Sequence, residues 1–145
     1  MPLKTRITFL HREFQLLLLQ YLAFFLLKKE EIEEQLQLLL KARPAYQGDP
    51  FLESCYWEKL SDLYLRVGDF KDLGEPVKAL HLAVQRGYPS AHLYQKLGYF
   101  SFQAGNREMA REYLEKAVKA PGNRTRAAED LKNLGLLKTK PSPKP

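Results

Sequence analysis

The sequence predicts an all-α protein, built as a short α-solenoid of antiparallel helix pairs. Three observations lead to this fold class. No stretch alternates apolar and polar residues over the length of a β-strand. Apolar residues recur instead at every third or fourth position, which is the spacing of an amphipathic helix. Short breaks rich in glycine, proline and asparagine divide the helical segments into pairs.

Length and composition agree with a single globular domain and exclude a disordered chain or a polytopic membrane protein. The chain has 145 residues, of which 45% are hydrophobic and 28% charged, close to the average for soluble proteins. Its net charge of +6 would suit nucleic acid or an acidic membrane surface. The excess lies at the two ends, however. A basic N-terminal segment at 1–12 carries a net +3, residues 124–145 carry a net +4, and the region between them is nearly neutral.

The first helical segment contains an unusually apolar run, FQLLLLQYLAFFLL, at residues 14–27. A membrane span needs about 20 apolar residues, whereas this run is shorter and is interrupted by Gln15 and Gln20. We interpret the run as a helix that needs cover on more than one face, in part from another chain. Contact with a membrane surface is the alternative interpretation.

Apolar residues continue at helical spacing up to Pro44, whose ring disfavours helix in the residue before it. They are Ile32, Leu36, Leu39 and Leu40. Residues 8–42 therefore form either one long helix or a hairpin with its turn at Lys28-Lys29. The spacing of the apolar residues fits both interpretations, and a loop at 44–50 follows in either case.

The next two helices are bounded by clear start and stop signals. Asp49 can cap a helix that has Pro50 in its first turn and that ends near Arg66. A second helix starts after a loop, at Glu75-Pro76, and closes at Gly87. The two helices form one hairpin.

The last part of the chain predicts three more helices and a tail. A helix capped by Ser90 covers about 90–104, a turn follows, and a second helix covers about 107–119. A final helix covers 125–136. The tail at 138–145 contains three prolines and no large apolar residue, so we expect it to be flexible.

Residues 90–123 carry a spaced signature within this helix pair. Its positions are Tyr94, Leu97, Gly98, Gly105, Asn106, Ala110, Leu114, Ala117 and Pro121. This pattern resembles the tetratricopeptide repeat, a helix–turn–helix unit of about 34 residues. The small residues Gly98 and Ala110 would let the two helix backbones approach closely. The resemblance implies a right-handed superhelix of stacked helix pairs.

Further segments resemble looser parts of the same repeat array. Residues 54–89 match the signature with three extra residues, which we place at 71–76. Residues 13–46 match it as a degenerate first helix pair, with Lys28-Lys29 at the turn. Residues 124–137 resemble the polar capping helix that ends such a stack.

The sequence contains no pattern that predicts catalysis. His11, His81 and His92 lie far apart in the sequence and lack the spacing of metal ligands. The single cysteine, Cys55, has acidic neighbours, which raise rather than lower the pKa of a thiol. No glycine-rich phosphate-binding motif occurs. We therefore expect no enzyme activity, no cofactor and no metal.

In tetratricopeptide proteins, the first helices of successive pairs line a groove that binds peptides or helices of other proteins. By this resemblance, the partner-binding residues are Phe14, Leu17, Tyr21, Phe24, Phe25, Glu58, Asp62, Leu65, Arg66, Gln95, Tyr99, Phe102 and Gln103. The aromatic residues would anchor an amphipathic helix or extended segment, and a few basic residues of the partner would face Glu58 and Asp62. Alternatively, the chain's own N-terminal helix covers Tyr99 and Phe102.

We therefore expect a cytoplasmic, non-catalytic interaction protein, such as an adaptor, a scaffold or a chaperone-like subunit. Its partner would be another protein, or a second copy of the chain bound through the N-terminal helix. Two alternatives stay open. One is a nucleic-acid-associated factor that uses the basic ends, and the other is an assembly factor attached to a membrane surface through residues 14–27.

Overall fold

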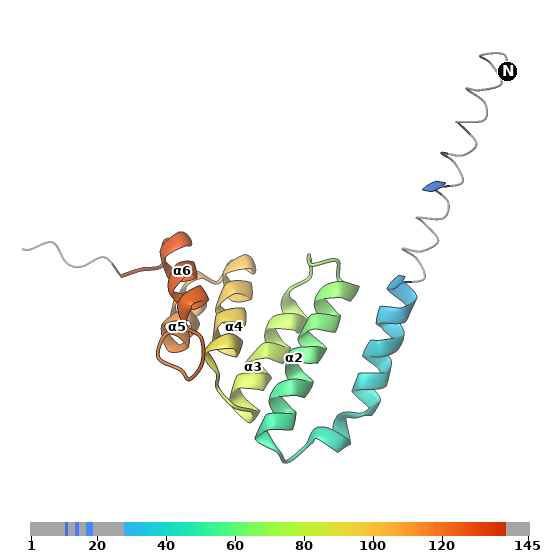
Figure 1. Cartoon of the computed structure of the whole chain (residues 1–145), viewed down its shortest axis with the longest axis horizontal. Coiled ribbons are helices and arrows are strands. Elements are labelled where there is room, and N and C mark those ends of the chain that lie inside the picture. The colour runs from blue at the N-terminus through green and yellow to red at the C-terminus, as the bar shows by residue number, and fades with distance from the viewer. Residues whose placement is uncertain (1–10, 12–13, 15–16, 19–27, 139–145) are drawn as a thin grey trace, which may run out of the picture.

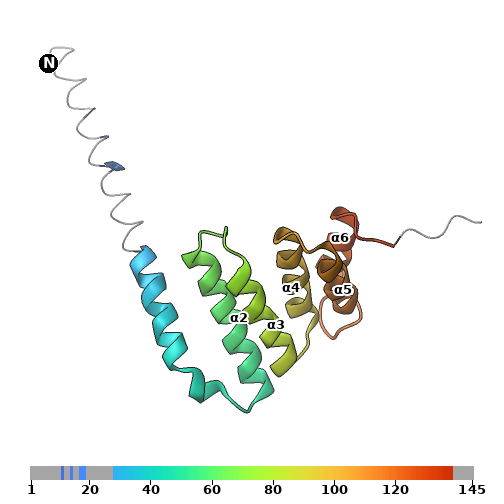
Figure 2. The same cartoon turned by 180° about the vertical axis from the view of Figure 1, so that it is seen from behind.

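The computed structural model describes residues 11, 14, 17–18 and 28–138, and all regular structure in them is helical. Residues 28–41 form a helix that leads into a short 3₁₀-helix, η1 (Arg43–Tyr46). The α-helices that follow are α2 (Pro50–Val67), α3 (Gly74–Arg86), α4 (Ala91–Gln103), α5 (Arg107–Ala117) and α6 (Thr125–Asn133). The helices succeed one another along the long axis of the molecule (Figure 1; Figure 2). The predicted all-α fold class is confirmed.

Side chains cap the first turn of three of these helices. The Asp49 carboxylate accepts hydrogen bonds from the backbone N–H groups of Phe51 and Leu52, at 2.8 and 3.1 Å. The Ser90 hydroxyl accepts one from the first turn of α4 at 3.2 Å, and Asn106 caps α5 in the same way. The predicted caps at Asp49 and Ser90 are confirmed. A cap acts within one turn, so the local sequence is enough to locate it.

Helices α2 and α3 form one antiparallel pair, and α4 and α5 form a second. In the second pair, a Cβ atom at Gly98 would lie 2.7 Å from Cγ of Leu114, so the two helices pack too closely there for a larger residue. In the first pair, Ser61 stands 37 positions before Gly98. The Ser61 hydroxyl donates a hydrogen bond to the carbonyl of Pro76 at 2.9 Å. A small residue therefore occupies the same place in both pairs, as an internal repeat requires.

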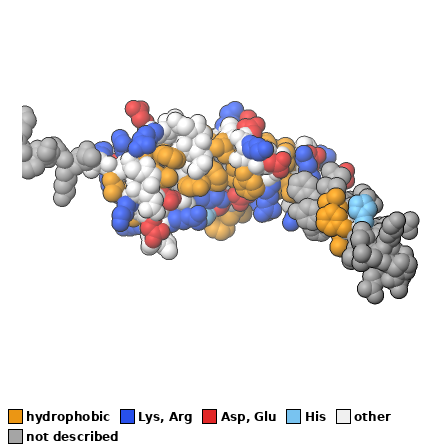
Figure 3. Space-filling view, turned by 90° about the horizontal axis from the view of Figure 1, so that it is seen from above, with side chains coloured by type: hydrophobic (Ala, Val, Ile, Leu, Met, Phe, Trp, Pro, Cys, Tyr) orange, Lys and Arg blue, Asp and Glu red, His pale blue; other side chains and the backbone are white. Residues whose placement is uncertain are grey.

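The connection within the first pair is three residues longer than the connection within the second. Residues 68–73 join α2 to α3, whereas residues 104–106 join α4 to α5. Asp69 and Phe70 adopt left-handed backbone conformations, with φ angles of 52° and 60°. The loop leaves 62% of Phe70 exposed. Figure 3 shows apolar side chains among charged ones on the face of the molecule seen from above.

The helices lie in two rows, which we name the front row (α2, α4 and α6) and the back row (the helix at 28–41, α3 and α5). Ion pairs join α2 to α4, and other contacts join α4 to α6. In the back row, the hydroxyl of Tyr113 in α5 is hydrogen-bonded to the ring of His81 in α3 at 2.8 Å. Leu40, in the helix at 28–41, lines a cavity of about 270 Å³ together with residues of α3.

Three clusters of buried apolar side chains follow one another along the stack. The first joins the helix at 28–41 to α2 and includes Leu36 and Leu60. The second joins the two helix pairs and includes Leu80 and Leu97. The third packs Leu131 of α6 against α5. The hydrophobic core is therefore a line of contacts between neighbouring helices, as expected for a solenoid.

The interpretation that places a turn at Lys28-Lys29 is wrong, because both residues are helical. Neither glycine nor proline occurs there, and the Lys, Glu and Gln residues around it favour the helical state. The earlier half of the predicted helix pair at 13–46 lies largely outside the described residues. Pro44, predicted to begin a loop, lies in η1, where its fixed φ angle suits the first turn of a short helix.

Candidate partner-binding groove

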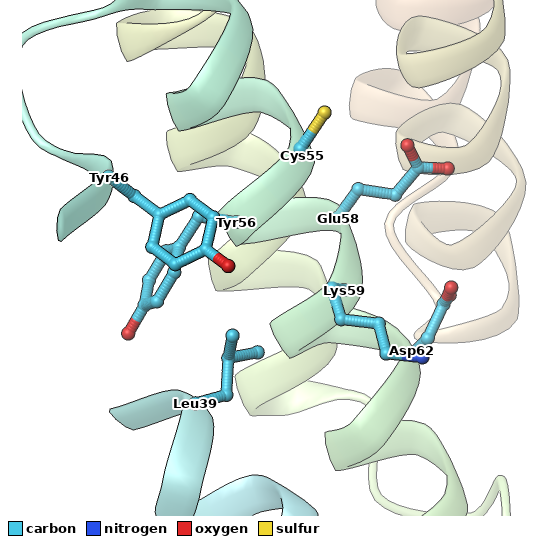
Figure 4. A pocket seen from close by; sticks show the side chains of 7 residues that line it. All are labelled: Leu39, Tyr46, Cys55, Tyr56, Glu58, Lys59 and Asp62. Carbon is cyan, nitrogen blue, oxygen red and sulfur yellow. The ribbon is translucent and has the colours of Figure 1, made fainter. Parts of the chain in front are cut away.

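A groove lies at the N-terminal end of the front row, between the helix at 28–41 and α2. Its volume is about 440 Å³, and the residues that line it are Leu39, Tyr46, Cys55, Tyr56, Glu58, Lys59 and Asp62. Figure 4 shows the α2 side chains on the face of that helix turned away from α3. Three elements that are separate in the sequence therefore build the groove: the helix at 28–41, η1 and α2.

One wall of the groove is apolar and aromatic. The ring of Tyr46 packs against the ring of Tyr56, with 5.4 Å between their centroids, and Leu39 also lies on this side (Figure 4). Tyr56 is 2% exposed and forms the base of the wall, whereas Leu39 and Tyr46 are half-buried. Covering such a wall with an apolar side chain of a partner is favourable, because apolar surface is removed from water.

The other wall carries charged groups, and its two carboxylates are already paired within the chain. Nζ of Lys96 lies 2.8 Å from Oδ1 of Asp62 and 3.2 Å from Oε1 of Glu58. The ring of His92 is hydrogen-bonded to the same Glu58 oxygen at 2.5 Å. Burial alone would raise the pKa of Glu58, but the His92 hydrogen bond and the Lys96 charge outweigh it, so the pKa lies below its ordinary value. The expectation that these acids attract basic residues of a partner therefore loses its basis.

Most of the predicted partner-binding residues are accessible in the structure. Four are exposed: Phe14, Leu17, Arg66 and Gln103. Four are half-buried: Glu58, Asp62, Tyr99 and Phe102. Two are buried: Leu65 and Gln95. Tyr21, Phe24 and Phe25 lie outside the described residues.

Leu65 and Gln95, predicted as partner contacts, are buried in the structure. They are 3% and 6% exposed. Gln95 donates a hydrogen bond to Asp130 of α6 at 2.6 Å, because α6 packs beside α4. Leu65 lies where the long loop turns back, and its carbonyl accepts a hydrogen bond from the Phe70 N–H at 2.8 Å.

The position of Phe102 bears on the alternative in which the chain's own N-terminal helix covers Tyr99 and Phe102. This side chain packs against the cluster that α5 and α6 form, so these helices provide part of its cover. Tyr99 makes an edge-to-face contact with the ring of Phe100, with 5.5 Å between the centroids. The run at 14–27 that was to cover both residues lies mostly outside the described residues.

Sequence reasoning missed seven residues of the groove and its charge network. They are Leu39, Tyr46, Cys55, Tyr56, Lys59, His92 and Lys96. A signal for two of them was present in the repeat itself. An offset of 37 residues relates the first helices of the two pairs, and it aligns Lys59 with Lys96. The same offset aligns Cys55 with His92.

A second charged cluster lies beside the aromatic wall and holds it in place. The Arg43 guanidinium lies over the rings of Tyr56 and Trp57, 4.9 and 4.8 Å from their centroids. Its Nη2 lies 3.1 Å from Oε1 of Glu53, and Nε1 of Trp57 donates to Oε2 of Glu53 at 2.8 Å. Burial would raise the pKa of Glu53, but these two hydrogen bonds and the Arg43 charge lower it below its ordinary value. The cluster ties η1, and with it Tyr46, to α2.

The chemistry that the groove offers is an apolar wall beside an exposed thiol and an exposed ammonium group. Within the described part of the chain, no three His, Cys, Asp or Glu side chains are placed to hold a metal ion. None of the helices described is long and apolar enough to cross a bilayer. The chain matches no protein-family model and no curated protein.

Proposed function

We propose that the protein is a non-catalytic interaction module of the tetratricopeptide type, which serves as an adaptor, scaffold or chaperone-like subunit. Its front row is the face that binds a segment of a partner protein, and the groove beside α2 is the main anchor point. The partner places an apolar side chain against Leu39, Tyr46 and Tyr56. Burial of that side chain supplies most of the binding free energy.

The open end of the front row is the observation that carries this proposal. Within the stack, α2 packs beside α4, and α4 packs beside α6. The side of α2 that is nearer to the helix at 28–41 has no front-row neighbour among the described residues, and the groove of about 440 Å³ lies on that side. Phe14 and Leu17 are also exposed, by 65% and 62%. Apolar surface of this kind favours binding to another protein.

Photo-crosslinking in the cells that naturally make the protein tests the proposal. A photoreactive amino acid replaces Lys59 or Gln103 in the front row, or Gln85 in the back-row helix α3 as a matched control. All three side chains are exposed, so each probe can meet a neighbouring molecule. We expect a discrete protein adduct from the two front-row positions and none from Gln85.

Other products would contradict the proposal. Adducts to nucleic acid would favour a factor that acts through the basic ends of the chain. Adducts to lipid would favour attachment to a membrane surface. Equal protein capture from Gln85 would show that the front row is not a specific binding face.

A further inference from the structure

Resting on the function proposed above, we infer that the groove receives an amphipathic helix of the partner, and that this helix presents two carboxylate side chains, one turn apart, to Lys59. The repeat itself leads to this partner chemistry. The structure shows which side chains α2 presents to α4, the next helix of the front row. The groove lies beside α2 at the position where a helix preceding α2 in the row would lie.

Helix α4 shows how one front-row helix recognises the helix before it. That preceding helix, α2, presents Glu58 and Asp62, which are four positions apart and therefore on the same face. Lys96 of α4 contacts both carboxylates, at 3.2 and 2.8 Å. His92, one turn before Lys96, is hydrogen-bonded to Glu58 as well. The contact between α2 and α4 is thus a basic residue on one helix and an acidic pair on the preceding helix.

Helix α2 carries the counterpart of this basic residue. Lys59 stands 37 positions before Lys96, the offset at which Ser61 and Gly98 take matching places in their helix pairs. The side chain of Lys96 is 18% exposed and pairs with two carboxylates. Lys59 is exposed, lines the groove and forms no ion pair with a described residue. It has the position of Lys96 without the two carboxylates.

The remainder of the groove fits the apolar side of a helix. Leu39, Tyr46 and Tyr56 form one wall, and Lys59 lies on the other side of the cavity. A bound segment therefore needs apolar and acidic residues on adjoining faces, as an amphipathic helix has. A volume of about 440 Å³ holds side chains rather than a whole helix, so the helix backbone lies across the opening.

The apolar run of the protein itself does not have this chemistry. Residues 14–27 contain neither Asp nor Glu. Neither the run of the same chain nor that of a second copy can therefore supply two carboxylates to Lys59. We therefore assign the groove to a helix of a different protein, and occupation by a second copy is an outcome of the test below.

The sequence of α2 provides a defined probe, because α2 is the helix that already presents its acidic pair to Lys96. The probe is a peptide of residues 50–67 with Cys55→Ser, stapled because an isolated helix of this length is only marginally stable. In the full-length protein, Cys55 lines the groove and is the single cysteine. Its rate of reaction with a maleimide therefore reports whether the groove is occupied. At ten times its dissociation constant, the peptide should slow this reaction about tenfold.

Charge reversal tests the role of Lys59 in the same assay. Lys59→Glu replaces two attractions with two repulsions, so we expect the peptide to bind about tenfold more weakly. A peptide that carries Glu58→Lys and Asp62→Lys should bind the Lys59→Glu protein better than it binds the wild type. The matched control is Lys71→Glu, an equal charge change on an exposed residue of the long loop. It should alter the affinity by less than about twofold.

Three results would overturn the inference. The peptide could leave the reactivity of Cys55 unchanged, or its affinity could be insensitive to Lys59→Glu. Cys55 could also be protected without any peptide. Protection that does not depend on protein concentration would identify the chain's own run as the occupant, and protection that grows with concentration would identify a second copy. Protein adducts from the front-row crosslinkers would still support the proposed function in each case, so the two proposals can fail separately.

Discussion

At the scale of single residues, small side chains determine how closely the paired helices approach. Gly98 lies against Leu114 and Ala110 of the helix opposite. Ser61 takes the same place in the first pair, and its hydroxyl is accommodated because it donates a hydrogen bond to the carbonyl of Pro76. A position that tolerates only these small residues sets the distance between two helix backbones, and the distance sets which side chains fill the seam.

Gly98→Ala should destabilise the protein. The added Cβ would lie 2.7 Å from Cγ of Leu114 and 3.1 Å from the carbonyl oxygen of Ala110. Overpacking of this kind costs about 1–3 kcal/mol, and the better helix propensity of alanine offsets at most about 1 kcal/mol. The free energy of unfolding, measured in urea, should therefore fall. Gly74→Ala is the matched control: its Cβ meets no atom closer than 3.5 Å, so an equal fall there would refute the steric explanation.

The lowered pKa of Glu53 makes part of the stability depend on pH. Its ordinary pKa is 4.5, and its pKa in the folded protein is lower, so the unfolded chain takes up the proton first. Glu53 therefore contributes stability above about pH 4.5, and that contribution is lost as the pH falls through the folded-state value. Glu53→Gln should have a lower free energy of unfolding at pH 7 and should lose less of it on acidification. Urea unfolding at several pH values checks this, and parallel pH profiles for both proteins would contradict it.

At the scale of the element, local signals decide where helices begin. Asp49 satisfies two backbone N–H groups of the first turn of α2, and Pro50 follows at a position that needs no N–H donor. These signals act over three or four residues, and the sequence therefore predicts the starts of α2 and α4 correctly. No such signal occurs at Lys28-Lys29, where one interpretation placed a turn, and both residues are helical.

Asp49→Ala should lower the free energy of unfolding by about 1 kcal/mol, because two N–H groups of α2 lose their acceptor. The same change should weaken the groove, since the first turns of α2 lead to Cys55 and Tyr56. Asp49→Asn keeps an acceptor oxygen and is the matched control. Thermal unfolding followed by circular dichroism measures both variants. If Asp49→Asn were as destabilised as Asp49→Ala, the charge rather than the cap would be responsible.

At the scale of the whole molecule, Lys96 joins the two helix pairs along the front row. Its ammonium group forms ion pairs with Glu58 and Asp62 of the preceding pair. In the back row, His81 and Tyr113 make the corresponding connection. Polar contacts on both rows therefore link units that the apolar core also joins. We expect the described stack to unfold as one cooperative unit.

Lys96→Met should reduce the stability of both helix pairs together. It removes charge-assisted hydrogen bonds from a half-buried site and leaves two carboxylates side by side, which costs about 1–3 kcal/mol. Amide hydrogen exchange should show similar losses of protection in α2 and in α4. Lys78→Met is the control, because the Lys78 side chain is 72% exposed and lies 3.9 Å from Glu75, so it should cost less than about 0.5 kcal/mol. Loss of protection confined to one pair would show that the pairs unfold independently.

The site was less predictable than the fold, and particular residues show why. Glu58 and Asp62 follow from the repeat register and do lie in the groove wall. Their pairing with Lys96 and His92 depends on the distance between two helices that are more than 20 residues apart in the chain. Leu65 and Gln95 satisfy the same register and are buried, because the long loop and α6 lie against them.

The sequence by itself determined the all-α class, the caps of α2 and α4, and the small residues where paired helices meet. Each of these depends on spacing, propensity or hydrogen bonding within a few residues. Only the tertiary structure decided that Leu39, Tyr46 and Lys59 share one groove and that its two carboxylates are already paired. Burial and ion pairing depend on how separate helices are placed, and no local pattern encodes that placement.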